Sequence, residues 1–279
     1  MTRTADRSAE PCPACGEPIA ANYCAACGEQ RFDRSRHTVQ HFFAELTRFF
    51  TELDNRFLRS VGLLIARPGF LTREVIDGRR KQYLAPIALF AIANLVFFFT
   101  QPLANINTFN STLEMQQRDY LHSPLVQERV ADYLAAGQVP AAEFEAEYDA
   151  LSEDIAKSLI ILQVPILALL LTLIRVRSGS LMFDHLVWST HFYAFQLLLN
   201  AAITVGVFLY FKSGGNDFSL GVPVLLVTWL YLFLAMRKAF DDRIWVAALR
   251  SVAALFAFGL VIEIYRSMLF LVTFAFATA

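Results

Sequence analysis

Five long runs of apolar residues, four of them without any charge, constrain the fold of this chain more than any other feature. A helix needs about 20 such residues to cross the hydrocarbon core of a bilayer, with a range of roughly 17–25. Hydrophobic residues make up 56% of the chain and charged residues 18%, against about 45–50% and about 25% in ordinary soluble domains. This composition excludes a disordered chain, a small disulfide scaffold and a charge-driven nucleic-acid-binding domain. We therefore predict an all-α membrane protein of about five transmembrane helices, at residues 84–100, 158–174, 186–211, 220–236 and 251–276.

Lysine and arginine are distributed unevenly between the loops, and cytoplasmic loops carry the excess of these residues. With five spans, the segments before the first, between the second and third, and between the fourth and fifth lie on one side. They carry Arg79, Arg80, Lys81, Arg175, Arg177, Arg237, Lys238, Arg243 and Arg250. The loops on the other side carry only Arg118, Arg129, Lys157 and Lys212. This pattern predicts a cytoplasmic N-terminus and an extracytoplasmic C-terminus.

The loop of residues 101–157 is too long for a simple turn and contains ten Asp and Glu residues. Ser123 and Pro124 are typical of a helix start, and Gly137 is typical of a helix end. Residues 143–157 are expected to form a helix that continues into the second span. We expect a small acidic helical domain outside the membrane, with its carboxylates in water.

All four cysteines lie near the N-terminus, in two CxxC pairs: Cys12 with Cys15, and Cys24 with Cys27. A CxxC turn places two sulfurs at the separation that tetrahedral zinc requires. Four thiolates and no open position predict one structural zinc ion in a zinc ribbon. The alternative is two disulfides, which reducing conditions in the cytoplasm oppose. So short a segment cannot build a core, and the metal would supply its folding energy.

Apolar residues recur at helical spacing from Thr38 to about residue 66, with five phenylalanines on one side. Either this helix lies in the membrane interface or it packs on the protein's own spans. Arg67-Pro68-Gly69 ends it, and a short helix of about residues 70–77 should stop at Gly78. We thus expect three regions: a zinc ribbon with a basic linker (1–36), cytoplasmic or interfacial helices (37–82), and the membrane domain (83–279).

Ionisable residues inside a membrane are costly and suggest function. Glu263 is expected near the middle of the fifth span, with Arg266 three residues further on the same helix face. Glu263 is either a proton- or ion-coupling carboxylate or the partner of Arg266 in a local ion pair.

The third span carries a stripe of polar residues at helical spacing: His185, Ser189, Gln196 and Asn200. His191 lies about 120° away, so the two histidines are not expected to share a metal within this helix. Either the stripe lines a cavity, or it makes hydrogen bonds between helices. Asn94 and Gln163 are candidates for the same seam, and Pro165 should kink its helix.

The chain resembles an uncharacterised family of bacterial multi-pass membrane proteins with an N-terminal zinc ribbon. The residues that carry the resemblance are Tyr23-Cys24-x-x-Cys27-Gly28, Arg67-Pro68-Gly69, Gly78-Arg79-Arg80-x-x-Tyr83-x-x-Pro86 and the stretch from Asp184-His185 to His191. Two departures from the family pattern are Arg79 in place of lysine and the displacement of a glutamine to Gln30. The resemblance implies a location in the bacterial inner membrane. It implies no mechanism, because the family has no assigned activity.

No hydrolase, metalloprotease, phosphate-loop or dinucleotide motif is present in the sequence. The favoured hypothesis is a non-enzymatic membrane protein whose zinc ribbon docks a cytoplasmic protein. The second is a small transporter or channel that uses Glu263, Gln196 and Asn200; the third is an intramembrane enzyme built on Asp184, His185 and His191. The expected partners are the bilayer and anionic lipid headgroups, which the basic linker would contact, rather than nucleic acid. The sequence predicts no oligomeric state.

Overall fold

The computed structural model describes residues 10–11, 15–19, 24–28, 56–79, 82–103, 111–137, 139–176, 178–214 and 221–278. The chain divides into two compact units, Met1–Asp54 and Asn55–Ala279. Each unit is described by itself.

The first unit contains a small hairpin. Strands β1 (Glu10–Pro11) and β2 (Pro18–Ile19) pair antiparallel, with Glu10 opposite Ile19. After the hairpin, the backbone N–H of Gly28 donates to the carbonyl of Cys24 at 2.7 Å, which closes a tight turn. Cys12 and the stretch from Thr38 to residue 55 lie outside the described residues.

The described residues of the second unit form five helices that are long and apolar enough to cross a membrane, as the sequence predicts. The first is α3 (Pro86–Thr100) with a short 3-10 turn, η2 (Gln101–Leu103). The second joins α6 (Ala141–Leu159), the 3-10 turn η3 (Ile160–Leu162) and α7 (Gln163–Ile174). The others are α8 (Met182–Lys212), α9 (Gly221–Phe240) and α10 (Ile244–Ala277).

Two of these helices are much longer than the predicted spans. The helix that contains span 158–174 begins at Ala141, and the one that contains span 251–276 begins at Ile244; both extend over 34 residues. At 1.5 Å per residue, each is about 50 Å long, well beyond a hydrocarbon core of about 30 Å. The helices extend beyond the predicted spans because charged residues interrupt an apolar run but do not interrupt a helix. The expected helix of residues 143–157 does continue into the helix that contains residues 158–174. The α10 helix is continuous through Glu263 and Arg266.

Pro165 explains the local irregularity in the second long helix. Proline has no N–H and its ring clashes with the carbonyl four residues earlier, here that of Ile161. The backbone responds over Ile160–Leu162 by tightening into the 3-10 turn η3.

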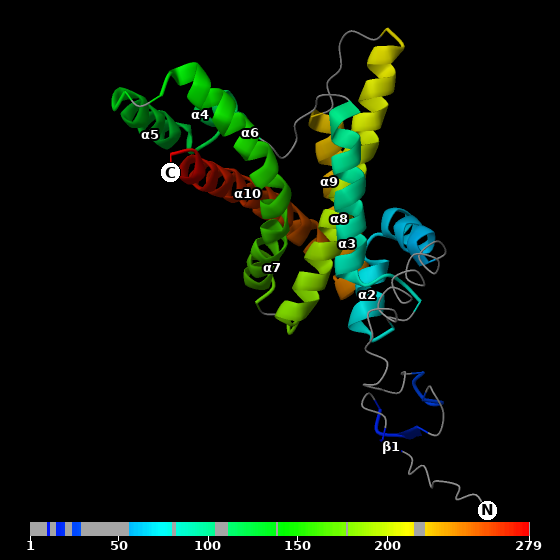
Figure 1. Cartoon of the computed structure of the whole chain (residues 1–279). Coiled ribbons are helices and arrows are strands. Elements are labelled where there is room, and N and C mark those ends of the chain that lie inside the picture. Colours follow the sequence, from blue (N-terminus) through cyan, green and yellow to red (C-terminus); the bar gives the residue numbers. More distant parts are fainter. Residues whose placement is uncertain are drawn as a thin grey trace, which may run out of the picture. The chain divides into compact units, whose positions relative to one another are not determined.

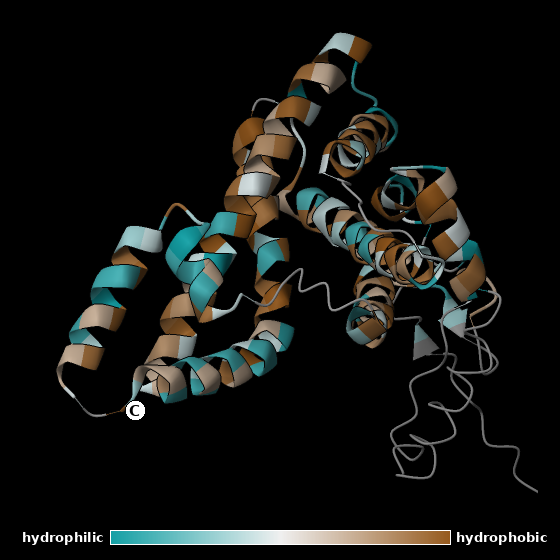
Figure 2. Ribbon diagram, turned by 90° about the horizontal axis from the view of Figure 1, so that it is seen from above, coloured by the Kyte–Doolittle hydropathy of each residue, from teal (hydrophilic) through white to brown (hydrophobic). Residues whose placement is uncertain are grey.

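The surfaces of the long helices remain strongly apolar, which fits lipid rather than water as their solvent. Leu95, Phe99, Leu226, Leu249 and Phe256 are all more than half exposed. Figure 2 shows hydrophobic residues (brown) over much of the helical ribbon and hydrophilic residues (teal) gathered on some of its helices.

The α8 helix is the centre of the packing, and it lies beside α3 and α7 (Figure 1). Its first half is buried around Trp188, Phe192 and Leu197. The Phe192 ring meets Phe258 of α10 edge-on at 5.0 Å, and Phe195 stacks on Tyr231 of α9 at 3.6 Å. Interlocking aromatic rings therefore join three of the long helices.

The segment before the first long helix packs on this core. The described part of its first helix covers residues 56–66, and α2 (Phe70–Ile76) follows. Leu64 and Leu71 are buried in the main core, and the Ser60 hydroxyl accepts a hydrogen bond from the Leu84 N–H. The amphipathic stretch is expected either to lie in the membrane interface or to pack on the protein's own helices. Its described part, residues 56–66, packs on the protein's own helices.

Gly69 shows why the chain turns as it does between these helices. Its φ is +80°, and a Cβ there would lie 2.3 Å from the carbonyl oxygen of Ala235 in α9. Only glycine allows so close an approach of two backbones in this conformation. The Arg67-Pro68-Gly69 turn thus fixes α2 against α9.

The segment between the first two long helices forms a small helical cap of α4 (Leu113–Arg118), α5 (Ser123–Ala135) and the first part of α6. His122 rather than Ser123 is the N-cap of α5, and Gly137 follows its end with a φ of +71°. The cap packs on the last turns of α10 through Tyr148, Phe270 and Phe274.

Candidate functional site

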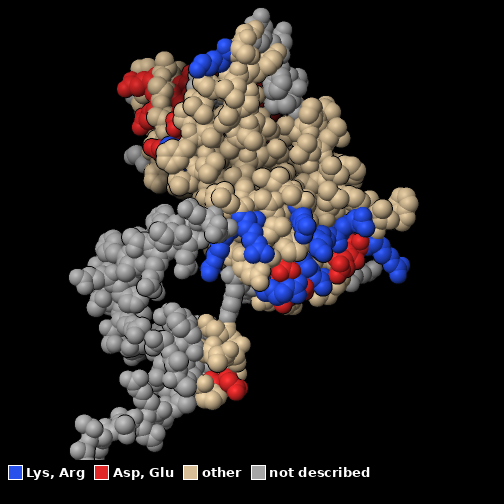
Figure 3. Space-filling view, turned by 90° about the vertical axis from the view of Figure 1, so that its right-hand side faces the viewer, with Lys and Arg blue, Asp and Glu red and all other residues tan. Residues whose placement is uncertain are grey.

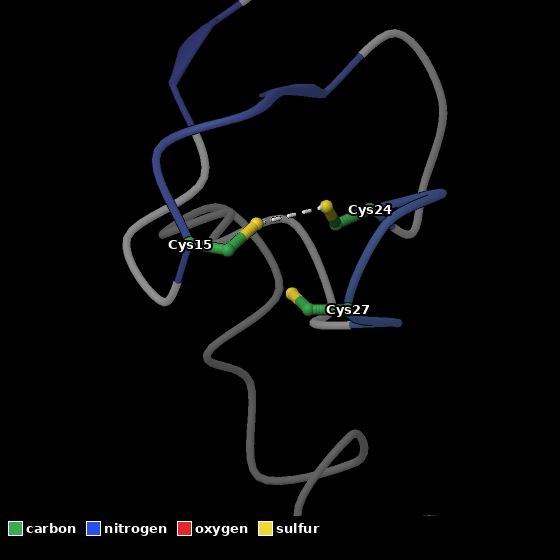
Figure 4. A group of neighbouring side chains, drawn as sticks. All are labelled: Cys15, Cys24 and Cys27. Carbon is green, nitrogen blue, oxygen red and sulfur yellow. Dashed lines mark hydrogen bonds between the residues drawn. The ribbon is translucent and has the colours of Figure 1, made fainter.

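Three cysteines converge in the first unit. The sulfurs of Cys15, Cys24 and Cys27 all lie within 4.8 Å of one another, and those of Cys15 and Cys24 are 3.5 Å apart (Figure 4). Gly16 and Gly28, each directly after a cysteine, have φ values of +78° and +71°. Their left-handed backbone allows the tight turns that direct both ends of the cluster inward.

The cluster has the donor chemistry of a metal site. With metal–sulfur bonds of about 2.3 Å, a tetrahedral ion separates its sulfurs by roughly 3.8 Å, close to the observed spacing. Hydrogen bonding, above all from the Cys27 backbone N–H, lowers the pKa of the Cys24 thiol to about 6. Thiolate is the form that binds metal. Cys15, Cys24 and Cys27 could therefore hold a metal ion.

Two residues of the polar stripe of α8 form hydrogen bonds to other helices, whereas Ser189 Oγ has no partner among the described residues. His185 Nδ1 lies 2.9 Å from the Thr172 hydroxyl of α7, and the Thr228 hydroxyl of α9 donates to Gln196 Oε1 at 3.4 Å. Ser189 is buried, and Asn200 is half-buried. The stripe thus faces two different helices along its length.

His191 points to a third element. Its Nδ1 lies 2.9 Å from the Thr72 hydroxyl of α2. The Asp184 carboxylate instead accepts a hydrogen bond from the Leu181 N–H at the start of α8. Asp184, His185 and His191, which an intramembrane enzyme would have to bring together, therefore engage separate partners.

Asn94 and Gln163 carry buried polar atoms on α3 and α7. Asn94 Oδ1 and both amide atoms of Gln163 have no hydrogen-bond partner among the described residues. No described hydrogen bond links either side chain to the α8 stripe. An unpaired buried amide is costly, so these two positions join other buried side chains of the long helices, among them Ser189 and Tyr193, whose polar atoms lack a partner among the described residues.

The expected ion pair of Glu263 and Arg266 is not formed in the described part of the chain. The Arg266 guanidinium lies 4.3 Å from the centre of the Tyr120 ring. The backbone carbonyl of Arg266 accepts a hydrogen bond from the side-chain amide of Gln116. Glu263 Oε2 is buried without a hydrogen-bond partner. The cap supplies the surroundings of both residues, because its helices pack on this part of α10.

His122 completes this junction between the cap and α10. Its Nε2 lies 2.7 Å from Gln116 Oε1, and its ring stacks on Tyr120. Burial lowers the pKa of His122, while the nearby Glu263 carboxylate acts in the opposite direction. The junction is therefore polar and aromatic, with no charge pair between its described residues.

A buried charge cluster that the sequence did not predict lies at the opposite end of the helices. Asp242, in the turn between α9 and α10, binds Arg175 at the end of α7 and Arg250 of α10. The Arg175 side chain is 2% exposed and lies 3.9 Å from the Phe240 ring centre. The only sequence signal is the dense run of charges at residues 237–243, which shows neither partner.

A second group of charges lies beside this cluster. Arg73 of α2 binds Asp241 at 2.7 Å and also Asp77, while Arg79 binds Glu74 and Asp77. Hydrogen bonds from Arg79 lower the pKa of the Glu74 carboxyl. Segments that the sequence assigned to one side of the membrane thus meet at one end of the unit. Figure 3 shows lysine and arginine side chains gathered along this end, next to a broad uncharged surface.

These features fit a helical, multi-pass integral membrane protein with a possible metal-binding cysteine cluster. Residues 54–98 match a family described as "Protein of unknown function (DUF3667)". The matched stretch includes the Arg67-Pro68-Gly69 turn, α2 and most of α3, but neither the cysteines nor α8. No curated protein and no solved structure matches the chain.

Proposed function

We propose that this chain is a non-enzymatic scaffold or regulatory protein of the bacterial inner membrane, whose N-terminal unit binds one structural zinc ion and docks a cytoplasmic protein. The observation that carries this proposal is the cluster of three cysteine sulfurs within 4.8 Å. Cys15, Cys24 and Cys27 would hold the ion, with Cys12 as the fourth ligand. Four thiolates leave no open coordination position, which suits a structural rather than a catalytic role.

The charge distribution supports the orientation that this function needs. Arg73, Arg79, Arg175 and Arg250 all belong to the charged end of the second unit, whereas acidic residues prevail in the cap. By the bias of lysine and arginine toward the cytoplasm, the charged end and the N-terminus face the cytoplasm. The cysteines would then lie in a reducing compartment that keeps them available for metal.

The first test is the metal content of the full-length protein purified in detergent. We expect one zinc ion per chain by elemental analysis, and loss of that zinc in the Cys24→Ser variant. The matched control is Ala26→Ser, which adds a hydroxyl in the same turn and leaves every thiol in place. Absence of zinc from the wild-type protein, or its retention by Cys24→Ser, would refute the metal site.

The second test concerns the docking role. Proteins cross-linked to the full-length chain in native membranes should include a partner that Cys24→Ser loses and Ala26→Ser keeps. Membrane insertion should be equal in the wild type, in Cys24→Ser and in Ala26→Ser. An identical set of captured proteins in the two variants would contradict docking through the ribbon, even if zinc binding were established.

A small transporter or channel is the second candidate. Buried polar atoms without partners at Glu263 Oε2 and in the Gln163 amide favour it, because a transport path needs polar groups that are available to a substrate. Ion or proton flux in proteoliposomes that Glu263→Gln abolishes would support this function. Equal flux in the variant, or none in the wild type, would count against it.

A further inference from the structure

A pocket opens at the charged end of the second unit, where the apolar surface of α9 ends. Its volume is about 680 Å³, within the range of small-molecule sites. The turn before α2, the last turns of α9 and the following loop form its walls. The lining residues are Ala66, Arg67, Pro68, Phe70, Leu234, Arg237, Lys238, Asp241 and Asp242.

The charges of this pocket do not cancel. Asp241 is bound by Arg73, and Asp242 is bound by Arg175 and Arg250, all three from outside the pocket. In the described residues, no ion pair involves the side chain of Arg67, Arg237 or Lys238. The pocket therefore presents three cations to a ligand, while each of its two carboxylates already has an arginine partner from outside the pocket.

An apolar track leads into the pocket along one side of α9. Val227, Leu230 and Leu234 are 45%, 50% and 38% exposed, and Lys238 continues the same row at steps of three and four residues. Such residues lie above one another on one face of a helix. The track would suit the acyl chain of a lipid whose anionic headgroup reaches the cations, whereas a soluble anion has no apolar part to contact the track.

We propose that this pocket binds the phosphate-bearing headgroup of an anionic phospholipid, with Arg67, Arg237 and Lys238 around the phosphate and an acyl chain along Val227, Leu230 and Leu234. Basic pockets between membrane helices are a known form of lipid recognition. The proposal does not depend on the cysteines or on the docking partner.

Native mass spectrometry of the full-length protein in detergent, titrated with phosphatidylglycerol, tests this site. Each cation near an anionic surface contributes about 1 kcal/mol, so replacing Arg67, Arg237 and Lys238 with glutamine should weaken binding roughly 100-fold. The control replaces Arg118, Arg129 and Lys212, which lie outside the pocket and carry the same total charge. It should bind like the wild type. An equal loss in both triple variants, or no loss in the pocket variant, would overturn the site.

Two further experiments distinguish a lipid phosphate from a soluble phosphate and test the site without a variant, whose misfolding would confuse the result. Glycerol phosphate and inorganic phosphate at millimolar concentration should not displace the lipid; full displacement by either would show a site for soluble anions and overturn the lipid proposal. On the unaltered protein, a photoactivatable phosphatidylglycerol should label residues 66–70 and 227–238. Labelling spread evenly over the long helices would contradict the proposal without the use of any variant.

Discussion

The two ends of the helical unit accommodate buried ionisable side chains in different ways. At the charged end, Asp242 lies between two arginines, so its buried charge meets opposite charge. At the cap, Glu263 and Arg266 lie one helical turn apart without pairing, and Arg266 meets an aromatic ring instead. The fold at the two ends therefore depends on charge pairing to different degrees.

This difference has a physical consequence. A buried charge that loses its partner is strongly destabilising, so the charged end should depend on the ionisation of Asp242. The cap junction depends on neutral hydrogen bonds and ring contacts around Gln116, His122 and Tyr120. Changes of charge there should alter stability only slightly.

Replacement of Asp242 should have the largest effect. In Asp242→Asn, Arg175 and Arg250 lose their shared counter-charge, and the unfolding free energy should fall by about 3 kcal/mol or more. The neighbouring Asp241 is the matched control, because its side chain is 73% exposed and an exposed pair contributes only about 0–1 kcal/mol. Thermal unfolding of both variants in one detergent compares them. Equal melting temperatures would refute the distinction between the buried and the exposed pair.

Two glycines with similar backbone conformation sharpen the comparison of packing at the two ends. Gly69→Ala should cost about 2–4 kcal/mol, because its Cβ would collide with the Ala235 backbone in addition to the strain of positive φ. Gly137, after α5 in the cap, has a φ of +71° and open space around it. Gly137→Ala should therefore cost only about 1 kcal/mol. If both variants melt alike, the close contact of α2 and α9 is absent in solution.

The fold of the long helices was predictable because lipid imposes apolar runs on any helix that crosses it. Arg67-Pro68-Gly69 and Gly78 likewise marked helix ends through local backbone chemistry. The Asp242 cluster was not predictable, since Arg175 lies 67 positions away in the sequence. The surroundings of Glu263 were missed for the same reason, because the cap reaches α10 only through tertiary packing. Cys15, Cys24 and Cys27 were found because their ligand spacing is local.

The pH dependence of stability should differ between the two ends through His122. Its pKa is lowered in the folded protein, mainly by burial, from an ordinary value of 6.5. The unfolded chain therefore binds a proton more readily, and stability should fall as the pH drops from about 6.5 toward the lowered pKa. This loss should be smaller than that caused by Asp242→Asn.

The measurement for His122 is the difference between wild type and His122→Gln in melting temperature from pH 7.5 to 5. Glutamine can keep a hydrogen bond to Gln116 but cannot titrate, so the variant should lose less stability on acidification. A fall of the same size in both proteins would assign the pH dependence to other groups.

The smallest effect is expected at Glu263, and it tests the comparison most directly. Glu263→Gln removes a charge that no described side chain pairs with, so the unfolding free energy should change by about 1 kcal/mol or less in either direction. The same change of acid to amide at Asp242 should cost several times more. A loss at Glu263 as large as that at Asp242 would mean that a cation, from Arg266 or from solution, compensates this carboxylate in the membrane. Unchanged stability combined with lost flux in proteoliposomes would instead separate a functional carboxylate from a structural one.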